Sequence, residues 1–265
     1  LFNVVEEYGE GILKIELIDD GEGMEKDELQ AFFDLGNSLR REDSKAIGEK
    51  GHGTKVYFNS AYIEVNTSKN GKELTAIMNE PFKKLYNREI PEVKVTESKN
   101  EKNDPGTHII IKGYNNNRRV KFTHEILKDY INWFTKFGSF EMEFGDDSNK
   151  DVRLFLKGLN RSEPEEISFG HYFPDESKEI NKLFDEYLVQ APDYYCKKII
   201  KTGYLKSFPD IKYQAVFCIE GNKIKQQYNP MLRRSGYTAP DGAYKVQERY
   251  GLWLSKDFIP VQSKN

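Results

Sequence analysis

The sequence has few residues that build metal centres or disulfide frameworks. Its 265 residues include two cysteines, Cys196 and Cys218, which lie far apart and form no CxxC pair. The four histidines are equally scattered. Because a metal site needs clustered ligands, we assign no metal ligands and expect two buried free thiols in a reducing compartment.

Long apolar runs are also missing. No run approaches the roughly 20 residues that a transmembrane helix needs, and no signal peptide is visible. We therefore expect a cytoplasmic protein with no membrane segment. The chain starts with Leu1 rather than methionine, so we interpret it as a fragment that lacks upstream elements.

The charge balance is close to neutral, with a formal net charge of −3 and a pI near 6.0. The sequence thus has no global basic field, and tight nonspecific nucleic-acid binding is not implied. A local basic strip stays open. The hydrophobic content of 37% is enough for the core of one large domain or two small ones.

The pattern of apolar residues predicts a mixture of strands and helices. A strand over 12–18 runs into the turn DDGEG at 19–23, and an amphipathic helix follows over 25–35. Residues 36–50 are polar and without periodicity, which is typical of a mobile loop. A composition shift near 115–119 predicts a domain boundary, giving domains of 1–117 and 118–265. The other expected helices are 51–58 (its start), 123–137 and 177–189, and the other expected strands are 61–67, 73–78, 92–97, 107–114, 152–159, 198–205, 213–219 and 251–259.

Two glycine motifs suggest a nucleotide site. In DDGEGM, at 19–24, the carboxylate of Asp19 at a strand end can accept a hydrogen bond from an exocyclic amine, and the glycines let a flat ring approach the backbone. In GEKGHGTK, at 48–55, a glycine-rich loop opens a helix and offers N–H groups to phosphates. The spacing is not that of a Walker A loop.

Each motif alone has a plainer interpretation. DDGEG could be a surface turn or part of a calcium loop, although the further ligands of an EF-hand are missing. A single GxxGxG is common. The two motifs together, joined by one helix and a loop, are far more specific.

The order of strand, DxGxGM, helix, loop, GxxGxGxK, helix and hairpin resembles the Bergerat fold of the gyrase, heat-shock protein, histidine kinase and MutL (GHKL) ATPases. The resemblance covers residues 10–115 and implies an α+β fold that binds ATP with Mg²⁺. Asp19 resembles the aspartate that recognises adenine, and the hydroxyl of Thr107 in Gly106-Thr107 resembles the one beside it; a β-branched residue that merely starts a strand is the alternative for Thr107. The nucleotide-binding residues that the resemblance implies are Asp19, Gly21, Gly23, Met24, Gly36, Asn37, Ser38, Gly48, Lys50, Gly51, His52, Gly53, Thr54, Lys55 and Thr107.

The second half resembles, more loosely, the S5-like α/β transducer domain that follows the Bergerat domain in several of these families. Residues 250–260 look like the strand-turn-strand of that domain, which carries a basic turn. Such transducers supply a basic residue to the γ-phosphate, and the candidates here are Lys256, Arg233 and Arg234. A solvated basic residue is the alternative for each. The run FFDLGNS and Lys55 look most like MORC proteins and their bacterial defence-associated relatives.

One expected element is missing from the resemblance. The family carries its catalytic glutamate and its magnesium-binding asparagine on a helix before the first motif, and only 18 residues precede Asp19. No catalytic residue is assigned, and we expect slow or no hydrolysis by this chain.

Three functions are compatible with this pattern. The leading hypothesis is an ATP-operated clamp, in which ATP orders the loop and two copies form a homodimer. A chaperone-type ATPase with polypeptide clients and a nucleotide-binding module without turnover are the alternatives. A nucleic-acid or protein partner is compatible with the first two.

Overall fold

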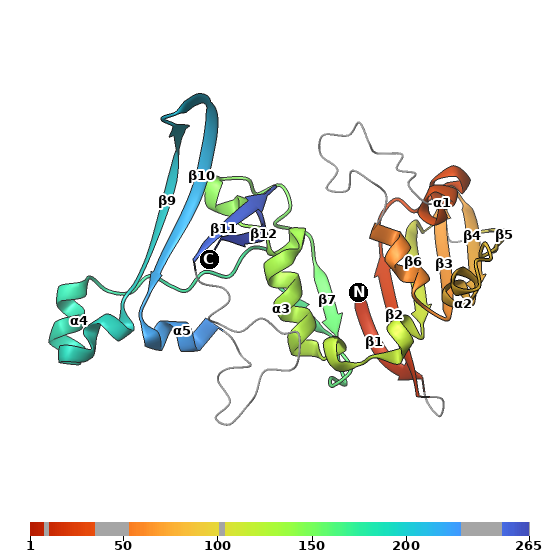
Figure 1. Cartoon of the computed structure of the whole chain (residues 1–265), viewed down its shortest axis with the longest axis horizontal. Coiled ribbons are helices and arrows are strands. Elements are labelled where there is room, and N and C mark those ends of the chain that lie inside the picture. Colours follow the sequence, from red (N-terminus) through yellow and green to blue (C-terminus); the bar gives the residue numbers. More distant parts are fainter. Residues whose placement is uncertain (8–10, 35–52, 101–103, 229–250, 265) are drawn as a thin grey trace. The chain divides into compact units, whose positions relative to one another are not determined.

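The computed structural model describes residues 1–264 apart from 8–10, 35–52, 101–103 and 229–250. The chain forms two compact units (Figure 1): the first comprises Leu1–His124 and Leu154–Ile167, and the second comprises Glu125–Arg153 and Ser168–Asn265. These units describe packing; the predicted division into functional domains of 1–117 and 118–265 stays a prediction.

The first unit is built on an eight-stranded sheet with the strand order β5-β4-β3-β6-β2-β1-β7-β8. Neighbouring strands are antiparallel except for β1 and β7, which are parallel. The strands are β1 (Phe2–Glu7), β2 (Ile12–Asp19), β3 (Tyr62–Lys69), β4 (Lys72–Asn79), β5 (Val93–Lys99), β6 (Gly106–Lys112), β7 (Leu154–Lys157) and β8 (Glu165–Ile167).

Alternating apolar residues give this sheet one buried face. Along β3, Ile63 and Val65 are fully buried, whereas the residues between them are only partly covered. The hairpin between β3 and β4 turns at Asn70-Gly71, where both residues have positive φ, 52° and 74°. Two successive residues of positive φ give the turn whose twist matches an antiparallel pair, and Asn-Gly is the sequence that favours it. The predicted hairpin is therefore confirmed.

The helices of the first unit are short. Its described α-helices are α1 (Lys26–Phe33) and α2 (Pro81–Tyr86). It also contains the 3-10 helices η1 (Gly53–Phe58), η2 (Tyr114–Asn117) and η3 (Val120–Phe122). Leu29 and Phe33 of α1 and Phe58 of η1 pack with the buried face of β3 and β4 in one apolar cluster. Burying each such side chain stabilises the fold by about 1.5–3 kcal/mol, so this cluster fixes α1 on the sheet.

The second unit holds a long ribbon and a short hairpin. Its helices are α3 (His124–Phe134), η4 (Lys136–Gly138), η5 (Glu141–Phe144), α4 (Ile180–Tyr187), η6 (Leu188–Tyr194) and α5 (Asn222–Tyr228), and its strands are β9 (Cys196–Leu205), β10 (Phe208–Glu220), β11 (Leu252–Lys256) and β12 (Ile259–Lys264). Among the described residues, β9 and β10 pair only with each other, as do β11 and β12. Trp133 of α3 contacts Trp253 of β11, with ring centroids 5.7 Å apart.

The structure differs from the sequence prediction at several elements; α2, α5 and β8 were not predicted, and the helix expected from residue 51 is the 3-10 helix η1. Residues 251–259 form no continuous strand; Asp257 and Phe258 both have positive φ and make a two-residue turn between β11 and β12, which is the strand-turn-strand that the resemblance implies. The predicted helix over 123–137 ends at Phe134. Strand β1 was not predicted, although it pairs with β2 along its whole length. No described helix is both long enough and apolar enough to cross a lipid bilayer.

Candidate functional site

A row of polar side chains crosses the buried face of the sheet where its apolar residues end. Asp19 of β2 lies opposite Thr107 of β6, and Thr107 lies opposite Thr67 of β3. Residues opposite each other on neighbouring strands have Cβ atoms about 4.5–5.5 Å apart, so the three side chains are neighbours. Thr67 and Thr107 are buried and Asp19 is exposed. The row therefore leads from the core to solvent.

Thr67 is the centre of this row. Its Oγ1 accepts a hydrogen bond of 2.7 Å from the backbone N–H of Met24 and lies 3.3 Å from both Thr107 Oγ1 and the carbonyl oxygen of Gly106. One buried hydroxyl thus joins the turn after β2 to the start of β6. It fixes the backbone of Met24 beside the sheet, and the Met24 side chain packs against the apolar cluster.

Glycines allow the turn after β2 to lie close to neighbouring strands. Gly23 has a φ of 70°, and a Cβ there would lie 2.0 Å from the carbonyl oxygen of Ser68. At the start of β6, a Cβ on Gly106 would lie 2.5 Å from the carbonyl oxygen of Asp19. Both contacts involve backbone that cannot move aside, so any other residue would separate the strands.

The carboxylate of Asp19 is held by its own turn. The N–H of Gly21 donates to Asp19 Oδ1 over 3.0 Å, and no donor contacts Oδ2 among the described residues. This hydrogen bond orients the side chain at the end of β2. The second oxygen is therefore open to a hydrogen-bond donor from solution.

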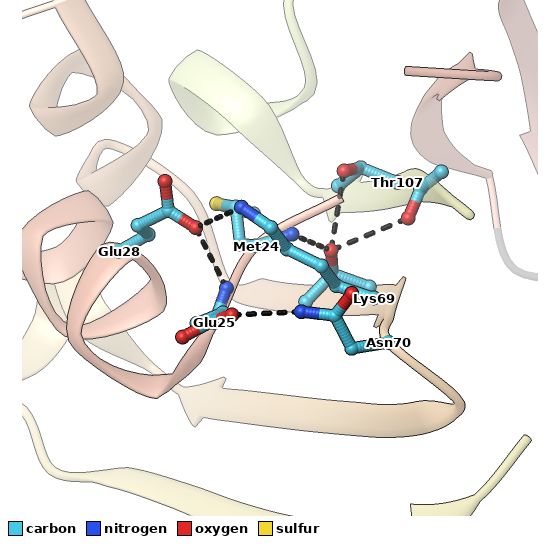
Figure 2. Close-up of polar contacts among 8 residues, drawn as sticks. Met24, Glu25, Glu28, Lys69, Asn70 and Thr107 are labelled. Carbon is cyan, nitrogen blue, oxygen red and sulfur yellow. Dashed lines mark hydrogen bonds and ion pairs between the residues drawn. The ribbon is translucent and has the colours of Figure 1, made fainter. Parts of the chain in front are cut away.

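The start of α1 is anchored to the β3–β4 turn, as Figure 2 shows. The backbone N–H of Glu25 donates to Glu28 Oε2 over 2.8 Å, and the same oxygen receives the amine of Lys69 at 2.9 Å. Asn70 Nδ2 donates to Glu25 Oε1, also over 2.9 Å. The bond to the carboxylate of Glu28 raises the pKa of Lys69. This cluster holds Met24, one residue before Glu25, at a fixed place beside Thr67.

Lys55 lies at the other end of α1. Its amine donates to the carbonyl oxygens of Ala31 and Phe32, 3.0 Å from each. A cation there satisfies carbonyls that have no partner within the helix and complements the helix dipole. Burial lowers the pKa of Lys55, although the charge of Asp34 opposes this shift.

The structure brings together part of the predicted site. Asp19, Gly21, Gly23, Met24 and Thr107 gather at one end of the sheet. Gly53 and Thr54 start η1, and a Cβ on Gly53 would meet no atom within 4 Å. The predicted residues that lie outside the described part of the chain are Gly36, Asn37, Ser38, Gly48, Lys50, Gly51, His52, Arg233 and Arg234.

Lys256 belongs to the second unit, where it is the last residue of β11. The turn after it is held by Phe258, whose ring packs 5.6 Å from the ring of Phe140 and whose carbonyl oxygen accepts the N–H of Phe140 over 3.1 Å. The backbone next to Lys256 is thus fixed by packing, while its side chain is exposed.

Sequence reasoning missed Thr67. A signal was present: Ile63, Val65 and Thr67 occupy alternate positions of β3, so a hydroxyl stands where the pattern requires an apolar residue. A polar residue at an inward position of a strand needs a buried partner. The partners of Thr67 come from Met24 and Thr107, which lie 43 and 40 residues away.

A known protein family matches the segment of the chain that contains this site. Residues 3–107 match the family described as "Histidine kinase-, DNA gyrase B-, and HSP90-like ATPase". This segment belongs to the GHKL ATPase superfamily. A search of curated proteins found no match.

Solved structures similar to this chain include ATPase regions of topoisomerase II. The region from Saccharomyces cerevisiae bound to ICRF-187 (dexrazoxane) has 16% identity and a TM-score of 0.32, with 42% of this chain and 31% of that chain covered. The ATPase and transducer domains from Balamuthia mandrillaris have 15% identity and a TM-score of 0.33, with 43% and 31% covered. The chain thus spans 31% of the length of each.

The first unit is an α+β structure in which α1 packs on the buried face of the sheet, and ATPases of the matched family bind ATP. The described residues fit an adenine. An exposed carboxylate and two hydroxyls share one row, and beside them lie two glycines at which a Cβ would clash with neighbouring backbone. Among the same residues, no three His, Cys, Asp or Glu side chains form a group that could hold a metal ion. No Mg²⁺ ligand is therefore assigned.

Proposed function

We propose that the GHKL segment of this chain binds ATP with its adenine against the row of Asp19, Thr107 and Thr67. The support is that row itself, in which a carboxylate held at one oxygen by Gly21 stands at the edge of two buried hydroxyls. The exocyclic amine of adenine donates to Asp19, and the ring lies against the glycine turn and Met24.

This arrangement selects adenine over guanine. The carbonyl oxygen of guanine occupies the place of the adenine amine and faces the carboxylate of Asp19, which has no proton to donate. A site with a built hydrogen-bond acceptor discriminates strongly against a ligand that lacks the donor. GTP should therefore bind far more weakly than ATP.

Calorimetry with Asp19→Asn tests the adenine pocket. Replacing a charged acceptor with a neutral one should weaken ATP binding by about 1–3 kcal/mol, and Asp20→Asn, the exposed neighbour outside the row, serves as the matched control. Equal ATP affinity in the wild type and Asp19→Asn would refute the assignment.

The phosphates of ATP and their Mg²⁺ bind at the glycine-rich segment 48–55 in this proposal. The N–H groups at the start of η1 supply donors, as helix starts do for anions. Residues 36–50 close over the bound nucleotide, so their hydrogen exchange should slow when a non-hydrolysable ATP analogue is added. Protection confined to residues 150–265 would contradict this part of the proposal.

Lys55 is the residue whose role is easiest to test here. If its amine moves from the α1 carbonyls to a phosphate, Lys55→Met lowers ATP affinity more than ADP affinity. If the amine only caps α1, the same variant lowers the free energy of unfolding and leaves the ratio of the two affinities unchanged. The two outcomes separate binding from structure.

The full activity that we propose is that of an ATP-operated clamp. ATP closes the loop over the site, two copies form a homodimer, and Lys256 contacts the γ-phosphate from the transducer-like second half. Support for Lys256 comes from the fixed turn beside it, because a rigid lysine distinguishes ATP from ADP by the terminal charge. Arg233 and Arg234 are the alternatives.

The ratio of ATP to ADP affinity in Lys256→Ala tests this contact. A smaller ratio with unchanged ADP binding supports it, and an unchanged ratio moves the role to the arginine pair. Light scattering with and without the ATP analogue tests dimerisation separately; a monomer under both conditions would contradict the clamp and leave the adenine pocket intact.

A further inference from the structure

The ribbon of β9 and β10 is exposed on both faces along its distal half. From Lys201 to Gln214 every residue except Gly203 is exposed, and neither strand pairs with a third strand in the described part of the chain. In Figure 1 the tip of the ribbon runs clear of the helices of its own unit, whereas Lys212, Tyr213 and Gln214, nearer the base, line a pocket with Trp133 of α3 and Trp253 of β11. A two-stranded ribbon has little stability of its own, so its exposed half is expected to gain stability from a partner.

The charges of this half distinguish it from the base of the ribbon. At the base, Lys197 is paired with Glu176 and Lys198 with Glu143, at 3.3 and 2.7 Å. In the distal half, the three lysines Lys201, Lys206 and Lys212 have no acidic partner among the described residues.

The distal half contains a single acidic residue, Asp210, so residues 201–214 carry a formal charge of +2 on a chain whose net charge is −3. This is the local basic strip that the overall composition does not reveal.

Apolar side chains lie between these lysines at the end of the ribbon. Tyr204 and Phe208 are 63% and 61% exposed, and Leu205 and Ile211 are 41% and 52% exposed. Pro209 follows Phe208 in a stretch where the register of the two strands shifts. Exposed apolar groups that gather at one place mark an interaction site. Combined with unpaired lysines, they favour a partner with both anionic and apolar surfaces.

We propose that the distal half of the β9–β10 ribbon is an arm that binds duplex DNA. The major groove, about 12 Å wide, admits a two-stranded ribbon, and the lysines on its strands and turn are placed to contact phosphates on the groove walls. Phe208 and Pro209 contact base edges or thymine methyl groups at the tip. A protein partner would not need three unpaired lysines with one acid, whereas a polyanion does. The inference does not rest on the nucleotide site.

Fluorescence anisotropy of a labelled 20-base-pair duplex, titrated with the whole chain without nucleotide, tests the proposal. The triple variant Lys201→Ala/Lys206→Ala/Lys212→Ala should bind roughly tenfold or more weakly at low salt. Its slope of log affinity against log salt should shrink by about 0.9 for each phosphate that a lysine no longer neutralises. Phe208→Ala should weaken binding without changing that slope, because an apolar contact releases no counterions.

The matched control is Lys94→Ala/Lys182→Ala/Lys223→Ala, which removes three exposed lysines outside the ribbon. Wild-type affinity and slope in the control, with both lowered in the ribbon variant, support the arm. Equal losses in the two triple variants, or no binding by the wild type, would overturn it. Circular dichroism checks that the ribbon variant is folded. Loss of self-association, or of binding to anionic vesicles, in Phe208→Ala with unchanged DNA binding would also overturn it in favour of a protein or lipid surface.

Discussion

The two faces of the eight-stranded sheet treat polar residues differently. On the face that carries α1, the central strands β2, β6 and β3 have polar side chains where their apolar residues end, in the row of Asp19, Thr107 and Thr67. On the opposite face they form a network within the sheet. There Glu16 accepts hydrogen bonds from Asn3 at 2.9 Å and lies 3.1 Å from the amine of Lys14.

That network continues across β6 to β3 and β4. His108 lies 3.2 Å from Glu16, and on β3 the carboxylate of Glu64 accepts hydrogen bonds from Tyr62 and Asn66 at 2.5 and 2.7 Å. The carboxylates of this face find their partners beside them, whereas Asn3 Oδ1 is buried without a hydrogen-bond partner among the described residues. In the row on the other face, Asp19 keeps one oxygen for a ligand. A solvent-exposed carboxylate oxygen that no described donor contacts, and not polarity itself, distinguishes the candidate site.

The largest difference between the faces should be seen in apolar truncations. Ile63→Ala removes a fully buried side chain and should lower the free energy of unfolding by about 2–5 kcal/mol. Ile77→Ala, on the opposite face of the neighbouring strand and only half-buried, should cost about 1 kcal/mol. Urea unfolding measures both, and equal costs would mean that the opposite face is also packed against a core.

The next effect concerns the hydroxyls. Thr67→Val keeps the shape of the side chain but leaves the N–H of Met24 without its acceptor, which should cost about 1–3 kcal/mol of stability. Thr75→Val, on the opposite face, removes a 2.7 Å bond to Asn66 in a half-exposed place and should cost about 0.5–1.5 kcal/mol. A smaller loss in Thr67→Val than in Thr75→Val would contradict the central role of Thr67.

Acid sensitivity should come from the network face. Burial alone would raise the pKa of Glu16. Its hydrogen bond with Lys14, the charge of Lys14, and the hydrogen bonds with Asn3 and His108 together hold that pKa below its ordinary value of 4.5. The bonds from Tyr62 and Asn66 likewise lower the pKa of Glu64. A lowered folded-state pKa gives stability that is present above pH 4.5 and lost as the pH falls through the folded-state value.

Glu16→Gln/Glu64→Gln should therefore lose less stability than the wild type between pH of about 5 and about 3. Urea midpoints at the two pH values measure this, with the exposed Glu92→Gln as the control. An unchanged pH dependence in the double variant would show that the network does not set the acid sensitivity.

The smallest effect is spectroscopic. Burial first, and then the hydrogen bond and charge of Glu64, raise the pKa of Tyr62 to about 12. Glu64→Gln removes the charge, so the tyrosine pKa should fall part of the way to its ordinary value of 10.0. NMR titration of the labelled ring measures the shift. An unchanged tyrosine pKa in Glu64→Gln would mean that burial alone raises the pKa of Tyr62.

Much of the first unit was predictable because its determinants are local. Alternation identified β2, β3, β4 and β6, and Asn70-Gly71 identified the turn of the hairpin. The glycine turn after β2 located Asp19 and Met24. Thr107 was predicted from the resemblance, and the structure places it opposite Asp19.

The rest depends on pairing between distant segments. Strand β1 reads FNVVEE, whose acidic end gives a weak strand pattern, and it is stabilised by pairing with β2 along its length. Strands β7 and β8 are four and three residues long, too short for periodicity to assign them to a sheet. Alternation along β3 marks Thr67 as an inward hydroxyl, but its partner Thr107 is identified only by the register of β3 with β6.

The return of β7 and β8 to the first unit has a practical consequence for anyone who wishes to cut the chain. The sequence enters the second unit after His124, comes back at Leu154 and leaves again after Ile167, so no single cleavage separates the two. A shortened protein ending at residue 117 would lack the partner that pairs with Phe2 and Asn3 through Leu156 and Lys157. Its β1 would become an open edge, and an open edge recruits strands from other molecules. Aggregation of such a shortened protein would thus report a missing strand, and would say nothing against its capacity to bind a nucleotide.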